Sequence, residues 1–248
     1  MFEATISDSR MFISIIKALA LIDEGTFIAD VSKLTLTEMD PAKVAMINLD
    51  LPAEVFDRYK CDQKTFFRID IDELRKIVKR IKSDDTVTML LDEKENRLRI
   101  KLQGKVSRTF SMALQEVEEV EPKTPQVPFK VHIKLIPEII KNSIMDAKII
   151  SDFVEFIANK DSFIIQAASN IGEVKVEIRN DDETVLEYQI EEDSKAIYPL
   201  NYLEDMLGAV PTSDVLAISF STDMPLKMEY LIPGNGRITY YLAPRREA

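Results

Sequence analysis

The chain has 248 residues, of which 46% are hydrophobic, so it can form one large or two ordinary domains with a substantial core. It has no run of the roughly 18 apolar residues that a membrane span needs, and its start lacks the pattern of a secretion signal. The net charge of −11 argues against a nucleic-acid partner unless cations gather on one surface. The single cysteine, Cys61, suits a reducing compartment, so we expect a cytoplasmic protein with no membrane partner.

The charge is distributed unevenly along the chain. Residues 1–114 have no net charge, whereas residues 129–248 carry a net charge of −8. Within the neutral part, the segment DELRKIVKRIK at residues 72–82 has five cations and two carboxylates. A basic stripe on an acidic protein indicates a surface that meets an anionic partner.

Helices and strands alternate in the first half of the chain. Apolar residues at helical spacing predict a helix over residues 9–22, with Ser9 as its N-cap. Alternating runs then predict strands at residues 26–31, 33–39, 43–52 and 64–70. A second amphipathic helix is predicted over residues 72–82, and strands at 86–92, 96–102 and 106–114 complete this half.

The segment 115–128 separates the two halves. It holds three prolines and four glutamates without sustained periodicity, which predicts an extended, solvated connector. We therefore expect domains at residues 1–114 and 129–248. In the second, helices are predicted over residues 136–148 and 199–209, and strands at 129–135, 153–158, 162–169, 172–180, 184–190, 215–221, 226–232 and 237–242.

Part of the sequence repeats at an offset of 129 residues. The stretch FIAD at residues 27–30 returns as FIAN at 156–159, and the apolar face of the second helix coincides with that of the fourth, as in Leu74 and Leu203. This predicts one α+β unit used twice, each copy with two helices packed on antiparallel strands. The alternative is two unrelated α+β halves that align by chance.

The residues of common catalytic and metal sites are scarce. His132 is the only histidine and lies about seventy positions from Cys61, so neither a catalytic triad nor a zinc-binding spacing is present. The segment Gly234–Gly236 stands between two strand patterns, which predicts a hairpin turn rather than a phosphate loop. We expect no catalytic residue, no metal site and no cofactor.

Cations lie opposite the apolar face on three of the four predicted helices, whereas the fourth carries Glu204 and Asp205 instead. These faces are either DNA-facing or ordinary solvated surfaces. The candidate DNA-facing residues are Arg10, Lys17, Arg75, Lys76, Lys79, Arg80, Lys82, Lys141 and Lys148.

Two strongly alternating strands, at residues 106–114 and 172–180, are candidates for unpaired sheet edges. Two different complementary edges on one subunit make a head-to-tail contact, which can close into a ring. We expect cations on one side of the contact to meet Glu138 and Asp146 on the other. The candidate interface residues are Arg80, Lys82, Val106, Arg108, Phe110, Met112, Glu138, Asp146, Val174, Val176 and Ile178.

Several segments resemble the sliding clamps of the proliferating cell nuclear antigen family, most closely its archaeal branch. They are MFEA at the start, EMDPAKVAMINLDLP at residues 38–52, the acidic connector, DMPLKMEY at 223–230 and ITYYLAPR at 238–245. The resemblance implies a ring of three subunits and six similar domains, with helices around double-stranded DNA, acting as a processivity factor at the nucleoid. It leaves open whether the ring is a homotrimer or a heterotrimer with paralogues.

The resemblance also implies an outer pocket that binds short peptide motifs of the replicative DNA polymerase, clamp loader, flap endonuclease and DNA ligase. Its residues here are Met39, Lys43, Val44, Met46, Val127, Pro225, Tyr241, Leu242, Ala243 and Pro244. Pro125 stands where the family's connector commonly has an apolar side chain. Lysines common on the first helix of relatives are Ile13, Ser14 and Ala20 here, so we expect DNA contact to depend mainly on residues 72–82. The alternatives are a checkpoint-type clamp or scaffold ring and, more remotely, an acidic hydrolase.

Overall fold

The computed structural model describes residues 1–117 and 124–245. Residues 118–123 of the predicted connector therefore lie outside the described residues. The first half contains β1 (Phe2–Ile6), α1 (Ser9–Ala18), β2 (Glu24–Ala29), β3 (Lys33–Met39), β4 (Ala45–Pro52), the 3-10 helix η1 (Ala53–Val55), β5 (Arg58–Cys61), β6 (Thr65–Asp70), α2 (Ile71–Val78), β7 (Thr86–Asp92), β8 (Arg97–Gln103) and β9 (Ser107–Ala113).

The second half repeats this order of strands and α-helices. It contains β10 (Val131–Leu135), α3 (Pro137–Ile150), β11 (Phe153–Ala158), β12 (Ser162–Ser169), β13 (Gly172–Arg179), β14 (Val185–Ile190), β15 (Ser194–Pro199), α4 (Leu200–Met206), the 3-10 helix η2 (Leu207–Thr212), β16 (Leu216–Phe220), β17 (Leu226–Ile232) and β18 (Gly236–Leu242).

The sheet topology confirms the duplication. In the first half the strand orders are β5-β1-β7-β8-β9 and β4-β3-β2-β6, and in the second they are β14-β10-β16-β17-β18 and β13-β12-β11-β15. Each strand of the first half thus has an equivalent nine strands later. All pairings are antiparallel, so the fold is the expected α+β unit used twice.

One additional pairing joins the two halves. β18 pairs with β4, so that two of the four sheets merge into a single sheet of nine strands. The register places Ile238 opposite Leu49 and Tyr240 opposite Ile47, and these side chains are at most 1% exposed. The strands equivalent to β18 and β4 are β9 and β13, and both are unpaired edges.

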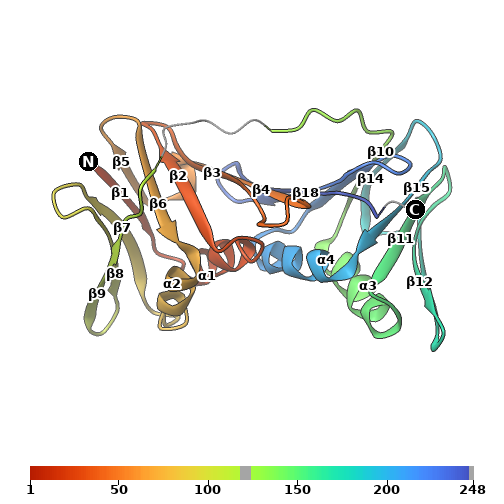
Figure 1. Ribbon diagram of the computed structural model, residues 1–248, viewed down its shortest axis with the longest axis horizontal. Helices are drawn as coiled ribbons and strands as arrows, with labels where there is room; N and C mark the ends of the chain where they lie inside the picture. Colours follow the sequence, from red (N-terminus) through yellow and green to blue (C-terminus); the bar gives the residue numbers. More distant parts are fainter. Residues whose placement is uncertain (118–123, 246–248) are drawn as a thin grey trace.

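All four α-helices lie on one side of the molecule, in the order α2, α1, α4, α3 along its length (Figure 1). The free edge β9 lies at one end, and β12, which pairs with the other free edge, lies near the opposite end (Figure 1). The helices pack their apolar faces on the sheets, through residues such as Leu74 on α2 and Leu203 on α4, each at most 1% exposed. No helix in the described parts of the chain has the length and apolar character of a membrane span.

Several helix ends lie elsewhere than the sequence predicts. α1 stops at Ala18, whose carbonyl accepts the hydroxyl of Tyr240 at 2.7 Å, and its N-cap is Asp8, which accepts from the N–H of Arg10, rather than the predicted Ser9. α2 stops at Val78, because the following turns have hydrogen bonds between residues three apart, such as that from the Arg80 N–H to the Ile77 carbonyl, instead of four apart. α4 also ends early, at Met206, and continues as η2.

Three strands, β1, β5 and β15, were not predicted. β5 is only four residues long and is held by pairing with β1, whereas β15 ends at a proline and is held by pairing with β11. Their strand structure therefore depends on tertiary pairing more than on local propensity. The predicted hairpin turn at Gly234–Gly236 is confirmed, since it connects β17 to β18 and Gly234 has φ +82°.

Candidate nucleic-acid interface and docking surface

Most of the predicted helix cations are exposed on the helical side. Arg10 and Lys17 lie in the first and last turns of α1, Lys76 lies on α2, and Lys141 lies on α3. The exposed residues Lys79, Arg80 and Lys82 follow α2 as its C-cap and the turns beyond it. The basic stripe of residues 72–82 is therefore part helix and part turn, and it is the densest group of cations on this side.

Arg75 is an exception and corrects the sequence prediction. Its side chain is only 24% exposed, and its guanidinium donates to the carbonyls of Leu19 and Ile22, the latter at 3.0 Å, and to the carboxylate of Asp72. These carbonyls follow the end of α1, where the helix leaves them without helical partners. Arg75 therefore fastens α2 to α1, and we remove it from the DNA-facing set.

The second half presents less free positive charge on this side. Lys148 on α3 forms an ion pair with Glu204 on α4, with about two fifths of each side chain exposed. An exposed pair of this kind contributes little stability, but the carboxylate offsets the charge that Lys148 offers to an anion. This arrangement is consistent with the expectation that residues 72–82 dominate DNA contact.

The end of the basic stripe is fixed by a buried carboxylate. Asp85 is 2% exposed, accepts from the N–H of Lys82 at 2.7 Å and forms an ion pair with Arg108. Arg108 also donates to the carbonyl of Arg80 at 2.8 Å. Burial raises the pKa of Asp85, but these donors outweigh it and hold the pKa below the usual value. Arg108 is thus bound within its own chain, and its contact with Glu138 or Asp146 of another subunit stays a prediction.

The opposite face of the nine-stranded sheet carries a continuous row of cross-strand partners. The row runs from β3 to β10 as Met39, Met46, Tyr241, Lys227, Ser219 and His132. Met39 is 44% exposed and Met46 is 9% exposed. The row therefore begins with adaptable apolar side chains, which suit a surface that accepts several partners.

The connector borders the other end of this row. Residues 125–129 form a pocket of about 560 Å³ together with His132, Ser219, Lys227 and Tyr241. Val127, a predicted residue of the partner-peptide pocket, lines this hollow, and so does Pro125. His132 Nδ1 and Ser219 Oγ form a hydrogen bond of 3.0 Å, which gives His132 a local structural role. His132, Ser219 and Lys227 were not predicted to line this pocket, because the register that gathers them from three strands is invisible in the sequence.

A tight turn after β3 holds the methionine end of the row. Asp40 is 5% exposed and accepts from the N–H groups of Ala42, Val44 and Ala45, at 3.0, 2.7 and 2.6 Å. Lys43 takes a left-handed conformation, with φ 59°, and is exposed. The sequence marks an Asp-Pro turn here but does not indicate that Asp40 is buried at its centre.

The remaining predicted pocket residues divide into two groups. Pro225, Ala243 and Pro244 are half-buried, and Ala243 is held by its N–H bond to the Val44 carbonyl at 2.9 Å. Leu242, in contrast, is fully buried in the core, which corrects its assignment to the pocket. The side chains of β18 point alternately to the two faces of the nine-stranded sheet, and that of Leu242 points to the face that the helices cover.

Both strands predicted as free edges are edges. On β9, Phe110 is half-buried, and on β13 the same holds for Val174 and Val176. Met112 and Ile178 are 4% and 5% exposed and already belong to the core of their own half, so they offer little surface for a new contact. Val106, in the turn before β9, is 69% exposed, and Glu138 and Asp146 on α3 are exposed.

Comparison with known proteins accounts for this architecture. Sequence models of the N-terminal and C-terminal domains of proliferating cell nuclear antigen match residues 1–121 and 123–245. The chain belongs to the proliferating cell nuclear antigen family. The DNA polymerase sliding clamp of Pyrococcus horikoshii is 35% identical over 247 residues, which cover 99% of each chain. DNA polymerase sliding clamp 1 of Thermococcus kodakarensis is 36% identical with the same coverage.

Solved structures agree with the family assignment. A crystal structure of PCNA from Thermococcus kodakaraensis superimposes with a TM-score of 0.92 and 27% identity, covering 99% of this chain and 100% of that one. Within the described residues of this family member, no group of three or more His, Cys, Asp and Glu side chains could hold a metal ion.

Proposed function

We propose that this chain is a DNA polymerase sliding clamp, in which three copies close a ring around double-stranded DNA and act as a processivity factor without catalysis of their own. The support is internal: β18 and β4 already join the two halves of one chain, and β9 and β13 are their free equivalents. The contact made within the chain is thus a template for the contact between chains, which is head-to-tail and able to close.

The register of the proposed contact follows from the repeat. Counted across the sheets from the equivalent strands β1 and β10, the successive partners Ala4, Met89, Ile100 and Phe110 correspond to Ile133, Ile218, Met228 and Tyr240. Phe110 is therefore the equivalent of Tyr240. Val176 faces Ile165 on β12 as Leu49 faces Leu36 on β3.

Tyr240 lies opposite Ile47 within the chain, and Ile47 is the equivalent of Val174, so Phe110 is expected opposite Val174 of the next subunit. By the same reasoning, Thr109 is expected opposite Lys175, because Thr239 lies opposite Asn48. The half-buried apolar side chains on both edges gain a partner in this register, and pairing removes two exposed edges.

The helices support DNA as the occupant of the ring. They share one side of the molecule, and that side carries the basic stripe of an otherwise acidic chain (Figure 1). Contacts of cations with phosphates carry no sequence information, so a ring held by them can slide. We propose that Lys76, Lys79, Arg80 and Lys82 supply most of these contacts, with Arg10, Lys17 and Lys141 adding to them.

The outer row supplies the docking site. We propose that the replicative polymerase, clamp loader, flap endonuclease and DNA ligase insert an apolar anchor beside Met39, Met46 and Tyr241 while the connector forms one wall. In the cell the ring would act in the cytoplasm at the nucleoid, and a homotrimer is the simplest state that the two edges allow.

Native mass and polymerase assays test this function together. The protein expressed alone is expected at three times 28.3 kDa, and it should extend the product length of a replicative polymerase on primed circular DNA. A trimer that leaves the polymerase unaffected would indicate a checkpoint-type clamp or scaffold ring. A strict monomer without either effect would contradict the proposal.

A further inference from the structure

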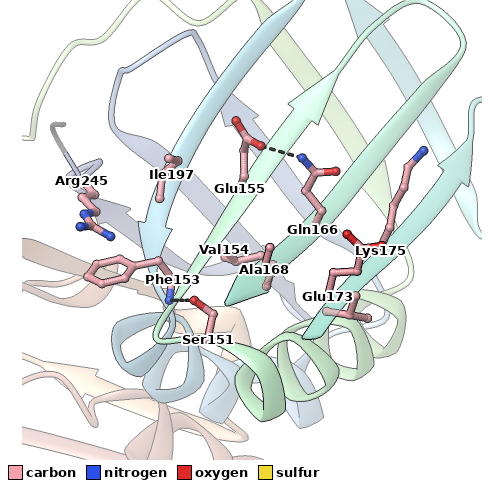
Figure 2. Close-up of a pocket in the computed structure, with 12 residues that line it drawn as sticks. Ser151, Phe153, Val154, Glu155, Gln166, Ala168, Glu173, Lys175, Ile197 and Arg245 are labelled. Atoms are coloured by element: carbon pink, nitrogen blue, oxygen red, sulfur yellow. Dashed lines mark hydrogen bonds between the residues drawn. The ribbon is translucent and has the colours of Figure 1, made fainter. Parts of the chain in front are cut away.

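A second hollow lies on the outer face of the C-terminal half, away from the row described above. It has a volume of about 520 Å³ and is lined by strands β11, β12, β13 and β15 and by the segment after β18. Figure 2 shows Phe153, Glu155 and Gln166 around it, with Glu173 and Lys175 on the side of the free edge β13. Phe153, Glu155 and Gln166 take part in neither the apolar row nor the proposed ring contact.

At the equivalent position of the first half stands the side chain of Arg68. Arg68 lies on β6 opposite Thr26 of β2, and Ile197 lies on the equivalent strand β15 opposite Glu155 of β11. The backbone around the two residues also matches. Gln115 donates its N–H to the Arg68 carbonyl at 2.9 Å, and Arg245 donates to the Ile197 carbonyl at 2.8 Å.

In the first half, the guanidinium of Arg68 is held by polar partners. It donates to the hydroxyl of Thr26 at 2.9 Å and forms ion pairs with Glu24 at 2.9 Å and Glu38 at 3.1 Å. These bonds lower the pKa of Glu24, with Arg68 as the main cause and Gln115 next. This position of the repeat therefore accommodates a guanidinium with carboxylates around it.

In the second half, Glu155 stands at the position of Thr26, Phe153 and Ala167 stand at those of Glu24 and Glu38, and Ile197 replaces Arg68. Ile197 cannot supply a charge, and within the described residues Glu155 accepts a side-chain hydrogen bond only from the amide of Gln166, at 2.7 Å. Lys175 pairs with Glu177 at 3.4 Å rather than with Glu155. A carboxylate that is half-buried and hydrogen-bonded only to an amide favours the binding of a cationic group from another molecule.

The aromatic wall of the hollow points to the same ligand. The guanidinium of Arg245 stands 4.0 Å from the centre of the Phe153 ring, so this ring already carries a cation on one face. Arginine stacks on aromatic rings and forms paired bonds with carboxylates. The acidic charge of residues 129–248 adds a longer-range attraction for a basic segment.

We propose that this hollow, the Glu155 pocket, binds an arginine side chain of a partner protein that docks on the outer face of the C-terminal half. The guanidinium would take the place that Arg68 takes in the first half, between Glu155 and Phe153. The pocket is complete in a single chain, so the proposal does not depend on ring closure. It offers each subunit a second docking point of different chemistry from the apolar row.

The test uses the full-length isotopically labelled protein and Nα-acetyl-L-arginine methylamide, with the neutral citrulline analogue as the matched control. Saturable NMR shifts are expected at the side-chain amide of Gln166 with the arginine probe and not with the citrulline probe. Glu155→Gln should weaken binding about tenfold, as expected for the loss of a charge-assisted hydrogen bond. Glu187→Gln, on the outer strand β14, should leave it unchanged.

A second variant tests the analogy with Arg68 directly. Ile197→Arg should fill the pocket from within, abolish probe binding and raise the melting temperature, whereas Ile197→Leu should retain binding. Equal shifts with citrulline, or full binding by Ile197→Arg, would overturn the proposal. So would binding that appears only in a monomeric edge variant, because the neighbouring subunit would then be the occupant. Native mass reports ring formation separately, so failure of the pocket and failure of the clamp are distinguishable.

Discussion

The hydroxyl of Tyr202 donates to the carboxylate of Asp40 at 3.0 Å, and this bond joins α4 of one half to the turn after β3 in the other. The same carboxylate accepts three backbone N–H groups of its own turn. One buried side chain therefore organises the turn beside the methionine end of the outer row and connects it to the helical side.

Asp40→Ala should destabilise the protein by about 2–4 kcal/mol, because four donors lose their acceptor. Tyr202→Phe removes only one of the four bonds and should cost about 1.5 kcal/mol. Denaturant unfolding measures both free energies. Equal stability of the Asp40→Ala variant and the parent would contradict the role given to this carboxylate.

Asp85 predicts a pH dependence of stability. Its folded pKa is lowered from the usual 3.8, so its contribution is fully present above pH 3.8 and is lost as the pH falls through the folded value. The free energy of unfolding of Asp85→Asn should therefore lie well below that of the parent at neutral pH, and the gap should narrow in acid. A gap that stays constant across this range would show that the charge of Asp85 is not the cause.

The register of the proposed ring contact can be checked by disulfide cross-linking. Thr109→Cys combined with Lys175→Cys should form covalent trimers on oxidation, because directly opposite residues have Cβ atoms about 4.5–5.5 Å apart. Thr239→Cys with Asn48→Cys is the matched control, since that pair should close within one chain. Thr109→Cys with Glu177→Cys is two residues out of register. If this pair cross-links with the same efficiency as the first pair, the derived register is wrong.

Reversing the charge of Lys76, Lys79 and Arg80 to glutamate should impair retention on circular DNA while leaving the native mass unchanged. The logarithm of the binding constant falls linearly with the logarithm of the salt concentration. The slope of this line should become shallower by about 0.9 for each phosphate that the variant no longer neutralises. The control reverses three exposed lysines outside the helices, Lys60, Lys94 and Lys195. If both triple variants lose DNA to the same degree, general charge rather than the basic stripe is responsible.

The apolar row predicts where partners dock. Met46→Asp should abolish binding of a docking peptide from the replicative polymerase of the source organism, measured by calorimetry, because a carboxylate would have to be desolvated against the anchor. Met46→Leu conserves volume and should keep binding within a few-fold. If the aspartate variant binds the peptide as tightly as the parent does, the docking site lies elsewhere on the protein.

The repeat was predictable because its signal is local and periodic. Apolar faces such as those of Leu74 and Leu203 recur at one offset, and alternation marked β9 and β13 as strands. Strands β5 and β15 escaped prediction because they are short or end in proline and depend on their pairing partners.

The site was less predictable, because its decisive contacts join residues far apart in the sequence. Arg75 belongs to a basic stripe by its position, but its partners at Leu19 and Ile22 lie more than fifty residues earlier and give it a structural role. Leu242 belongs to a motif of the family's pocket, but the alternation of β18 turns it into the core. Asp40 and Asp85 were missed for the same reason.

The covalent union of two repeats makes the boundaries around the proposed ring alternate in strength. Within a chain, the boundary between β4 and β18 is backed by fully buried side chains such as Ile47 and Tyr240, and it is closed by the chain itself. Between chains, the boundary rests on Phe110 and Val174, which stay half-exposed until they meet. Every second boundary in the proposed ring would therefore be able to open, whereas the boundaries within chains would stay closed. Entry of DNA would require separation of the strands at a boundary between chains only.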